Sequence, residues 1–322
     1  MTIILYRDLV KSTSMHQSSK STTLTLSKQV IVPLNCPDIV LAIAPCRSGT
    51  TAQLRVFAEN GIPSLYQPIK ATLRRQMDGE EGLFRIPDVG HVFIKETLGP
   101  YTEAESTIDP LAVLLEAGVP QEKIILITMM RDPIDAACSW IERFSFGAER
   151  SVLMENLVKA YQTVDRISER AKSIGVETHA FVYESLRDND PDDVTARLFR
   201  RLHLPFSSTS LENWTALPAM GTEESGISFP DEPEKYNYVE GHFFYDKVES
   251  STSLAYHPKS GEELRRHIAK NDILGFKVRG IVEIYDKVRR LCSAELGIQI
   301  LESVVFREPE LYSAAETLSR RR

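Results

Sequence analysis

Short apolar runs alternate with helical patterns along most of this chain. The apolar runs stand at 39–44, 91–94, 123–130 and 178–183. Their length and their content of β-branched side chains suit strands that are buried on both faces. Helical patterns stand at 52–58, 111–117, 152–173, 194–202, 262–269 and 278–291. This alternation predicts an α/β fold, in which a single domain has a central, mostly parallel sheet flanked by helices.

Breaks in this rhythm suggest how the chain is divided. Residues 1–36 are expected to be an N-terminal extension, and 37–322 are expected to form the domain. Within the extension, 11–28 are rich in Ser and Thr and contain no arginine, which favours a flexible or edge-strand segment over a transit peptide. The Pro-, Gly- and acid-rich stretch 207–261 is expected to be a substrate-binding lid. C-terminal helices are expected within 262–322.

Charge and cysteine content exclude several classes of protein. The net charge of −7 argues against a nucleic-acid or sulfated-glycan partner, which would require a positive field. Acidic residues gather between 223 and 249, as a solvated loop or as a rim that attracts neutral or cationic molecules. No CxxC pair is present, and the apolar runs are shorter than the ~18 residues of a membrane span. We therefore expect a cytoplasmic protein with free thiols and no metal.

A polar turn joins the first apolar run to the first helical pattern. It contains Arg47, Ser48, Gly49, Thr50 and Thr51. Backbone N–H groups at a helix start bind anions, and the helix dipole strengthens that binding. Glycine lets the backbone approach a ligand closely, the hydroxyls are donors, and the guanidinium suits phosphate oxygens. The turn is therefore predicted to hold a phosphate, although hydroxyl caps on an ordinary strand-to-helix turn would look similar.

This turn is not the phosphate loop of nucleoside triphosphatases that bind Mg²⁺. That loop needs GxxxxGK[ST], and no lysine follows Gly49. A metal-dependent nucleoside triphosphatase is therefore disfavoured.

A second polar group stands where the strongest apolar run ends. Arg131 follows that run, and Asp132 and Pro133 are well suited to start a helix. Ser139 lies within that helix, and helical side chains lean toward the helix N-terminus, so its hydroxyl can point back toward Arg131. The pair could bind a second phosphate, unless Arg131 merely pairs with Asp135 and Ser139 merely packs.

Taken together, these motifs resemble the sulfotransferase superfamily. The first turn is similar to the family's (K/R)SGTT loop for the 5′-phosphosulfate, and 131–139 is similar to its R(N/D)PxDxxxS motif for the 3′-phosphate. A third match, Tyr183 with the three residues after it, looks like the family's YEDL stretch, and 194–206 looks like the helix that ends in FLGLPF. The resemblance implies a P-loop-like fold, 3′-phosphoadenosine-5′-phosphosulfate (PAPS) as donor and 3′-phosphoadenosine-5′-phosphate (PAP) as product. Arg47, Ser48, Gly49, Thr50, Thr51, Arg131, Ser139 and Tyr183 would bind the donor.

The resemblance also suggests catalytic residues. The stretch from Ile94 to Pro100 looks like the family's IKTHLP, but no histidine follows Lys95. Glu96 is therefore the expected general base, and Lys95 is expected to neutralise the leaving oxygen. Both could instead form an ordinary ion pair at a strand end that faces water. His91, His179 and His242 are the alternative bases.

Two family features have no clear counterpart. Ala52 stands where many members have a tryptophan that stacks on adenine, and the RKG motif is matched only loosely, at 259–261 or 277–280. Aromatic candidates for stacking are Trp140, Trp214, Tyr236, Tyr238, Phe243, Phe244 and Tyr245, although packing in the core is the more usual role of such a residue.

The expected function is thus sulfation of a hydroxyl or amine on a small-molecule acceptor, such as a specialised metabolite. Two alternatives remain open: a P-loop-type kinase that requires Mg²⁺, and a nucleotide-binding protein without catalysis. The sequence does not determine the oligomeric state.

Overall fold

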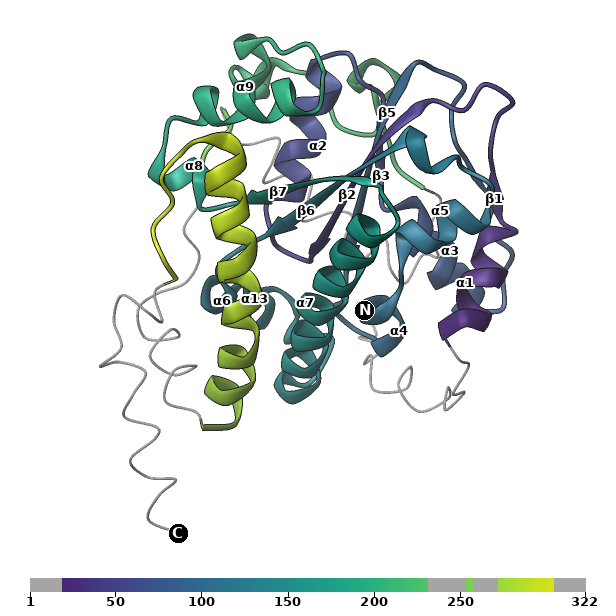
Figure 1. The fold of residues 1–322 in the computed structure, drawn as a ribbon. Coiled ribbons are helices and arrows are strands. Elements are labelled where there is room, and N and C mark those ends of the chain that lie inside the picture. The colour runs from purple at the N-terminus through teal and green to yellow at the C-terminus, as the bar shows by residue number, and fades with distance from the viewer. Residues whose placement is uncertain (1–18, 231–252, 257–271, 304–322) are drawn as a thin grey trace, which may run out of the picture.

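A central parallel sheet organises the structure, a computed structural model that describes residues 19–230, 253–256 and 272–303 (Figure 1). Within the described residues, this sheet has six strands, all parallel, in the order β7-β6-β2-β5-β3-β8. Their bounds are β2 Asp38–Pro45, β3 Ser64–Tyr66, β5 His91–Leu98, β6 Ile124–Met130, β7 Glu177–Val182 and β8 Ile227–Ser228. The predicted α/β fold with a mostly parallel sheet is confirmed.

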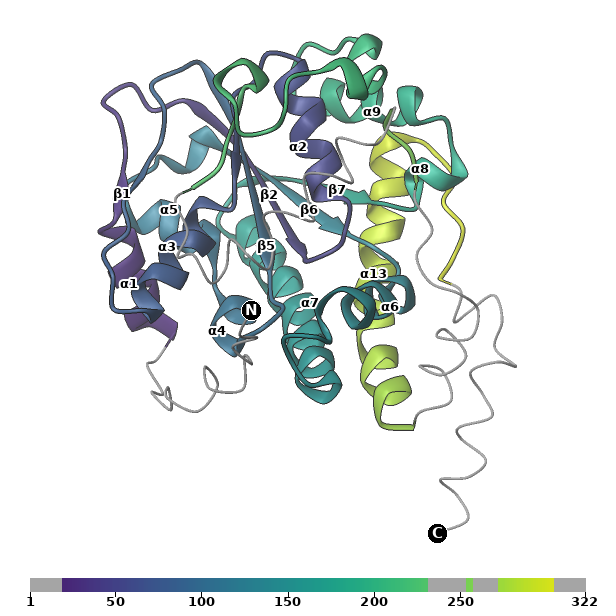
Figure 2. The same cartoon turned by 180° about the vertical axis from the view of Figure 1, so that it is seen from behind.

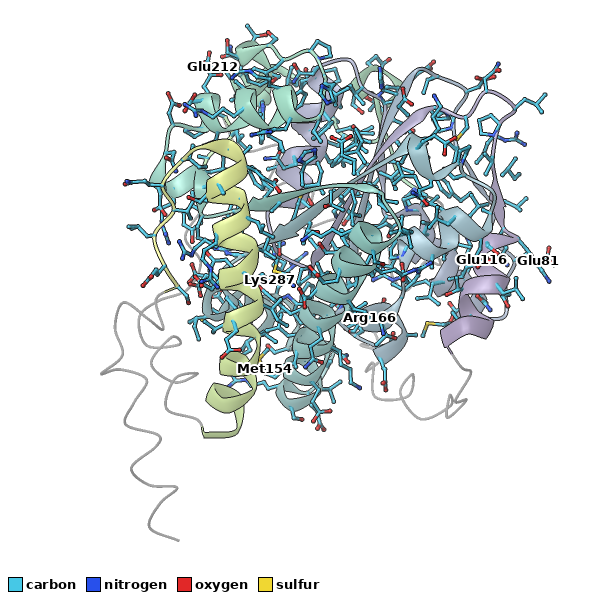
Figure 3. All side chains as sticks on the ribbon, in the orientation of Figure 1. Glu81, Glu116, Met154, Arg166, Glu212 and Lys287 are labelled. Atoms are coloured by element: carbon cyan, nitrogen blue, oxygen red, sulfur yellow. The ribbon has the colours of Figure 1, made fainter. Side chains whose placement is uncertain are left out.

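Helices cover both faces of this sheet (Figures 1 and 2). The long α7 (Arg150–Ser173) and α13 (Asp272–Leu296) pack against one face, and α2 (Thr50–Glu59) packs against the other. Lys287 of α13, labelled in Figure 3, joins the two long helices, since its Nζ lies 2.6 Å from Asp165 Oδ1 of α7. The other helices are α1 Ser19–Ser27, α3 Pro68–Met77, α4 Glu103–Thr107, α5 Pro110–Glu116, α6 Pro133–Phe144, α8 Ser185–Asp188 and α9 Pro191–Arg201. None of the helices in the described ranges is long and apolar enough to cross a lipid bilayer.

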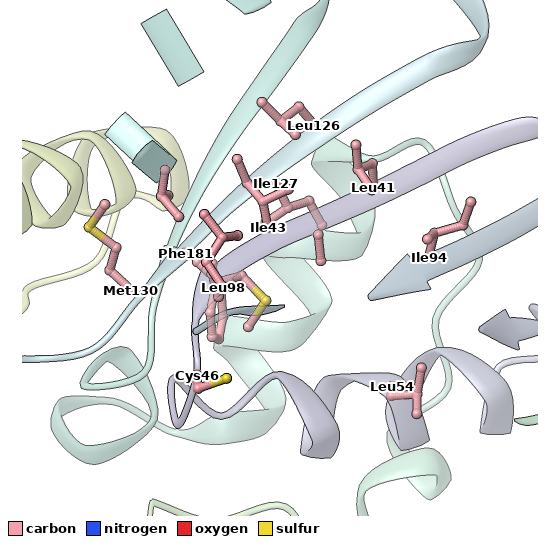
Figure 4. Close-up of a cluster of buried hydrophobic side chains, with 14 of the residues drawn as sticks. Leu41, Ile43, Cys46, Leu54, Ile94, Leu98, Leu126, Ile127, Met130 and Phe181 are labelled. Atoms are coloured by element: carbon pink, nitrogen blue, oxygen red, sulfur yellow. The ribbon is translucent and has the colours of Figure 1, made fainter. Parts of the chain in front are cut away.

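The central strands are buried on both faces, as their uninterrupted apolar runs predict. Every β2 residue after Asp38 is buried. Leu41 and Ile43 of β2 and Leu126 of the neighbouring β6 are fully buried. Figure 4 shows these side chains between the sheet and the helices, with Leu54 contributed by α2. Cys46 lies at the end of β2 beside this core, so the turn that follows starts from a rigid point.

The strand order places a topological switch point beside β2. The chain runs from β2 to β3 and β5 on one side of β2, and then crosses to β6 and β7 on the other. In open α/β sheets, ligands bind outside the carboxyl ends of the strands at such a switch point. The turn after β2 and the residue after β6 both lie at this edge.

Three parts of the chain differ from the sequence-based expectation. The segment expected to be flexible or an edge strand contains a helix, α1, whose Leu26 is fully buried. β5 does not end at Ile94 but continues to Leu98, so Lys95 and Glu96 lie inside a strand. The unexpected β3 and α3 lie between α2 and β5, while β1 (Val30–Ile31) and β4 (Phe84–Arg85) form a separate parallel pair.

The expected lid is described only in part. Residues 207–230 contain the short 3₁₀ turns Ser208–Leu211, Trp214–Ala216 and Glu223–Ser225 before β8; a further 3₁₀ turn, Gln121–Lys123, precedes β6. The helix expected at 262–269, the loose 259–261 motif, His242 and the aromatic candidates Tyr236, Tyr238, Phe243, Phe244 and Tyr245 lie outside the described residues.

Candidate functional site

The turn between β2 and α2 contains two residues in the left-handed region of backbone conformation, which favours glycine. Gly49 is the N-cap of α2 with φ of 79°, and Arg47 is also left-handed with φ of 73°. A Cβ on Gly49 would lie 2.3 Å from Cδ2 of Tyr183, so the backbone touches that ring directly. Ser48 is fully buried, and its hydroxyl donates to the Pro45 carbonyl at 2.9 Å. Glycine is therefore required at position 49 both by conformation and by packing.

The start of α2 is directed at the same place. No side chain in the described ranges caps this helix, and Thr50 and Thr51 occupy its first turn. The N–H groups of a first helical turn have no partner within the helix, and the helix dipole favours negative charge there. This helix start can therefore bind an anion.

The residues predicted for a second phosphate lie beside this turn. Arg47 Nε donates to Ser139 Oγ at 3.0 Å, a contact across 92 positions of sequence. Nη1 of Arg131 lies 3.5 Å from the Arg47 carbonyl, and Nη2 lies 3.9 Å from Asp135 Oδ2. Arg131 is 3% exposed, so it is held in the wall of the site. The structure thus brings the two predicted motifs together and also gives Arg131 the acidic neighbour considered as its alternative role.

Two guanidinium groups, the buried Arg131 and the half-buried Arg47, make this side of the site positive. Burial, together with the nearby charges of Arg131 and Arg143, lowers the pKa of Arg47 from its ordinary value. Cations held this close gain free energy when an anion binds between them, because the anion relieves their mutual repulsion. The electrostatics therefore favour a multiply charged anion.

Local sequence fixes the direction of Arg131. It directly follows β6, and Asp132 caps α6 by accepting the Ile134 N–H at 3.0 Å, with Pro133 in the first turn. Tyr161 of α7 donates its hydroxyl to the Arg131 carbonyl at 2.6 Å. Strand, cap and hydroxyl together hold the backbone of Arg131 in place.

Tyr183 and Glu184 complete this flank. The Tyr183 ring lies against Gly49, and Cζ of Arg131 lies 5.1 Å from its centroid. Glu184, 1% exposed, accepts the Asp132 N–H at 3.0 Å and the Tyr285 hydroxyl of α13 at 3.1 Å. Burial, reinforced by Asp132, raises the pKa of Glu184 to about 7. Glu184 was not predicted as a site residue, although it stands inside the YEDL-like stretch.

On the other side of the turn, Glu96 holds the start of α3. Its Oε1 accepts the Ile69 N–H at 2.7 Å, and its Oε2 accepts the Lys70 N–H at 3.3 Å. Glu96 is 1% exposed, and burial raises its pKa to about 7 against the opposing effect of these hydrogen bonds. A carboxyl with this pKa can take up a proton near neutral pH.

Lys95 is also buried but points elsewhere. Its Nζ lies 3.7 Å from the centroid of the Tyr66 ring, and it is 1% exposed. Neighbouring residues of a strand point to opposite faces of a sheet, so Lys95 and Glu96 do not lie on one face. They are not the solvent-facing ion pair that was the alternative interpretation.

A buried polar cluster on this flank was missed by sequence reasoning. Lys70 is fully buried, with Nζ 3.2 Å from Gln67 Oε1 and 3.6 Å from Cys46 Sγ. Thr97 donates its hydroxyl to Gln67 Oε1, and Cys46 Sγ lies 3.3 Å from that hydroxyl oxygen. The one available signal was Pro68, which is typical of a first helical position and would have located α3.

The alternative bases and stacking residues that the structure describes lie elsewhere. His91 is the first residue of β5 and is exposed, and His179 lies in β7 between Glu177 and Glu295. Trp140 is fully buried and donates to the Cys46 carbonyl at 2.7 Å, so it supports the turn from beneath. Trp214 is 2% exposed and donates to the Ser210 carbonyl. The loose motif at 277–280 lies within α13.

The site therefore has a flank with two arginines and a flank with a buried carboxyl and buried lysines, on either side of the turn at 47–51. Comparison of the chain with models of protein families found no match, and comparison with curated proteins found none either.

Proposed function

We propose that the chain is a sulfotransferase that transfers the sulfuryl group of PAPS to a hydroxyl or amine of a small-molecule acceptor. The contact between Arg47 and Ser139, beside Arg131, carries this proposal. PAPS has two anionic groups on one ribose unit, and a protein that binds it needs two neighbouring anion sites. The turn at 47–51 and the start of α6 supply such a pair.

The donor-binding roles follow from chemistry and position. Arg47, Gly49, Thr50 and Thr51 would hold the 5′-phosphosulfate through the guanidinium, the hydroxyls and the first N–H groups of α2. Ser48 would contribute mainly by fixing the turn, since its hydroxyl donates to Pro45.

The second anionic group would bind to the other motif. Arg131 and Ser139 would hold the 3′-phosphate, and Tyr183 would contact the nucleoside while it packs on Gly49. Arg47 reaches Ser139 directly, so the two anion sites share a wall.

The other flank would perform the reaction. Glu96 would take the proton of the acceptor as the new bond to sulfur forms and the bond from sulfur to the bridging phosphate oxygen breaks. Each carboxylate oxygen has two lone pairs, so one hydrogen bond from α3 to each oxygen leaves capacity to accept a proton. PAP would be the product. Lys95, which was expected to neutralise the leaving oxygen, lies on the opposite face of β5 from Glu96 and against Tyr66, so it is not assigned that role.

The charge of the chain bears on the chemical class of the acceptor. The net charge of −7 favours a small neutral or cationic acceptor over a sulfated polymer or a nucleic acid. A specialised metabolite that carries a hydroxyl or an amine fits this balance, and a cytoplasmic location fits a donor made inside cells.

Thermal unfolding in the presence of nucleotides tests the donor site. At ~100 times its dissociation constant, PAP should stabilise the fold by about 2.7 kcal/mol, which is visible as a shift in Tm. Arg131→Ala should remove most of that shift. Arg197→Ala, which removes an exposed arginine paired with Asp193 of α9, is the control and should keep it.

The same experiment separates the alternatives. If only ATP with Mg²⁺ raises Tm, the chain is a kinase-like protein and the sulfotransferase proposal is wrong. If PAP binds but Glu96→Gln changes no turnover with any acceptor, a nucleotide-binding protein without catalysis is the better account.

A further inference from the structure

A short piece of the expected lid lies directly against the arginine flank. Residues 253–256, here called the strap, are anchored by Leu254, which is 4% exposed and donates its N–H to the Leu211 carbonyl at 2.9 Å. The Ala255 carbonyl accepts the Tyr183 hydroxyl at 3.0 Å. The strap is thus attached to Leu211 and to Tyr183, the residue that packs on Gly49 of the turn at 47–51.

Tyr256 of the strap contacts Tyr183, Arg131, Arg187 and Asp135. Its ring lies 4.9 Å from the Tyr183 ring at 35°, and Cζ of Arg131 lies 5.6 Å from its centroid. Cζ of Arg187, which is bound through two hydrogen bonds to Asp188, lies 5.5 Å away. The Tyr256 hydroxyl donates to Asp135 Oδ2 at 2.7 Å.

These contacts bear on how Arg131 can bind a ligand. Asp135 Oδ2 lies 3.9 Å from Arg131 Nη2, longer than a hydrogen bond, and the same oxygen accepts the Tyr256 hydroxyl. The hydrogen bond from Tyr256 uses one lone pair of this oxygen and fixes the direction of the carboxylate, so Asp135 is held at a distance where it competes weakly for the guanidinium. The Tyr183 and Tyr256 rings meanwhile hold the guanidinium by cation–π contact, with their centroids 5.1 and 5.6 Å from its Cζ.

We propose that Tyr256 is a positioning residue for the donor's 3′-phosphate. Its hydroxyl holds Asp135 away from a close ion pair with Arg131, and its ring fixes the plane of the guanidinium. This inference rests on the proposed function, and it adds a residue from the strap to a site otherwise formed by the turn, α6 and the end of β7. Purely structural packing of Tyr256 would stabilise the fold without changing which nucleotide binds.

The test compares two nucleotides that differ in the 3′-phosphate. Dissociation constants for PAP and for adenosine 5′-monophosphate are measured by calorimetry in the wild type and in Tyr256→Phe, which keeps the ring. Tyr256→Phe should lower the preference for PAP about tenfold, the loss expected for one hydrogen bond to a charged partner. Trp214→Phe, which removes one buried hydrogen bond elsewhere in the expected lid, should leave the preference unchanged.

A double-mutant cycle isolates the role of Asp135. In an Asp135→Asn background no ion pair with Arg131 can form, so Tyr256→Phe should change the preference by less than about twofold. An undiminished effect in that background, or an unchanged preference in Tyr256→Phe alone, would overturn the inference and leave the proposed function intact. A wild type that shows no preference for PAP would instead reject the proposed function, and the inference with it.

Discussion

The two flanks of the turn at 47–51 have a similar framework but differ in the charged side chains that they place beside the turn. Each has a buried carboxyl with a pKa of about 7 that accepts from the backbone at the start of a helix: Glu184 accepts one N–H at α6, and Glu96 accepts two at α3. The α6 flank adds two guanidinium groups and a serine around that framework. The α3 flank adds two buried lysines, Lys70 and Lys95, and no arginine reaches the turn from it among the contacts of the described residues.

Under the proposed function, this difference separates binding from reaction. Guanidinium groups are permanently charged forks that suit phosphate, whereas a carboxyl with a pKa near neutrality suits proton transfer. The flank that matches the family motif residue by residue is the one with the binding chemistry. The flank that departs from it, where no histidine follows Lys95 and Glu96 is the proposed base, is the one with the titratable group.

Replacement of Glu96 should produce the largest difference between the effect on turnover and the effect on PAP binding. Glu96→Gln is expected to lower turnover of an accepted substrate by about 10²–10⁴-fold, the usual contribution of a general base, with little change in the dissociation constant of PAP. Steady-state kinetics and calorimetry on the same preparations measure both quantities. Glu184→Gln is the matched control and should weaken PAP binding more than it slows turnover; the reverse pattern would exchange the roles of the two flanks.

A change at the turn itself should disturb both flanks together. Gly49→Ala adds a Cβ 2.3 Å from the Tyr183 ring at a φ of 79°, and strain plus displacement of the ring should cost about 2–4 kcal/mol in free energy of unfolding. Gly61→Ala has a similar φ of 76° but nothing within 4 Å of its Cβ, so it should cost only about 1–2 kcal/mol. Urea unfolding measures the free energy of unfolding of both variants. Equal losses would mean that the contact between position 49 and Tyr183 does not contribute to stability.

The two carboxyls should leave a signature in the pH dependence of stability. Their pKa values are raised in the folded protein, so each contributes stability below pH ~4.5 that is lost as the pH rises through about 7. Each loss is at most about 3 kcal/mol, from 1.36 kcal/mol per pKa unit. Relative to Glu96→Gln, the wild type should therefore lose free energy of unfolding between pH 5 and pH 7.5. A parallel pH profile for the two proteins would contradict the burial of an ionisable Glu96.

The smallest effect is expected far from both flanks, at His179. Burial alone would lower the pKa of His179, but hydrogen bonds to Glu295 and Glu177 outweigh it and raise the pKa. The stability from these contacts is present at low pH and is lost as the pH rises through that raised pKa. His179→Gln should therefore destabilise the protein by about 1 kcal/mol or less at pH 6, less at pH 8.5, and leave PAP binding unchanged. Loss of PAP binding in this variant would extend the site beyond the two flanks.

The framework of this site could be predicted because its signals are local. The apolar runs identify β2 and β6, Asp132 with Pro133 marks the start of α6, and a strand that ends in a polar turn marks the carboxyl edge of a parallel sheet. The approach of Arg47 to Ser139 follows from that framework, since both lie at the same edge.

The α3 flank could not be predicted in the same way. β3 has only three residues, too few for a periodic pattern, and without it the position of α3 is undefined. Burial of Lys70 and Glu96 depends on helices packed from distant parts of the chain, and charged residues in sequence normally indicate an exposed surface. Tyr256 was missed for a related reason, because its contacts with Asp135 and Arg131 join segments more than a hundred positions apart.

The central claim, that the α6 flank binds a second phosphate, is tested most directly by nucleotide discrimination in Arg131→Ala. We expect the wild type to bind PAP at least about tenfold more tightly than adenosine 5′-monophosphate, because a charge-assisted contact to the 3′-phosphate is worth more than about 1.4 kcal/mol. Arg131→Ala should bring the two dissociation constants close to equality, mainly through weaker binding of PAP. If the wild type binds both nucleotides equally well, or if Arg131→Ala retains the full preference for PAP, the arginine flank is not a 3′-phosphate site and the proposed function is wrong.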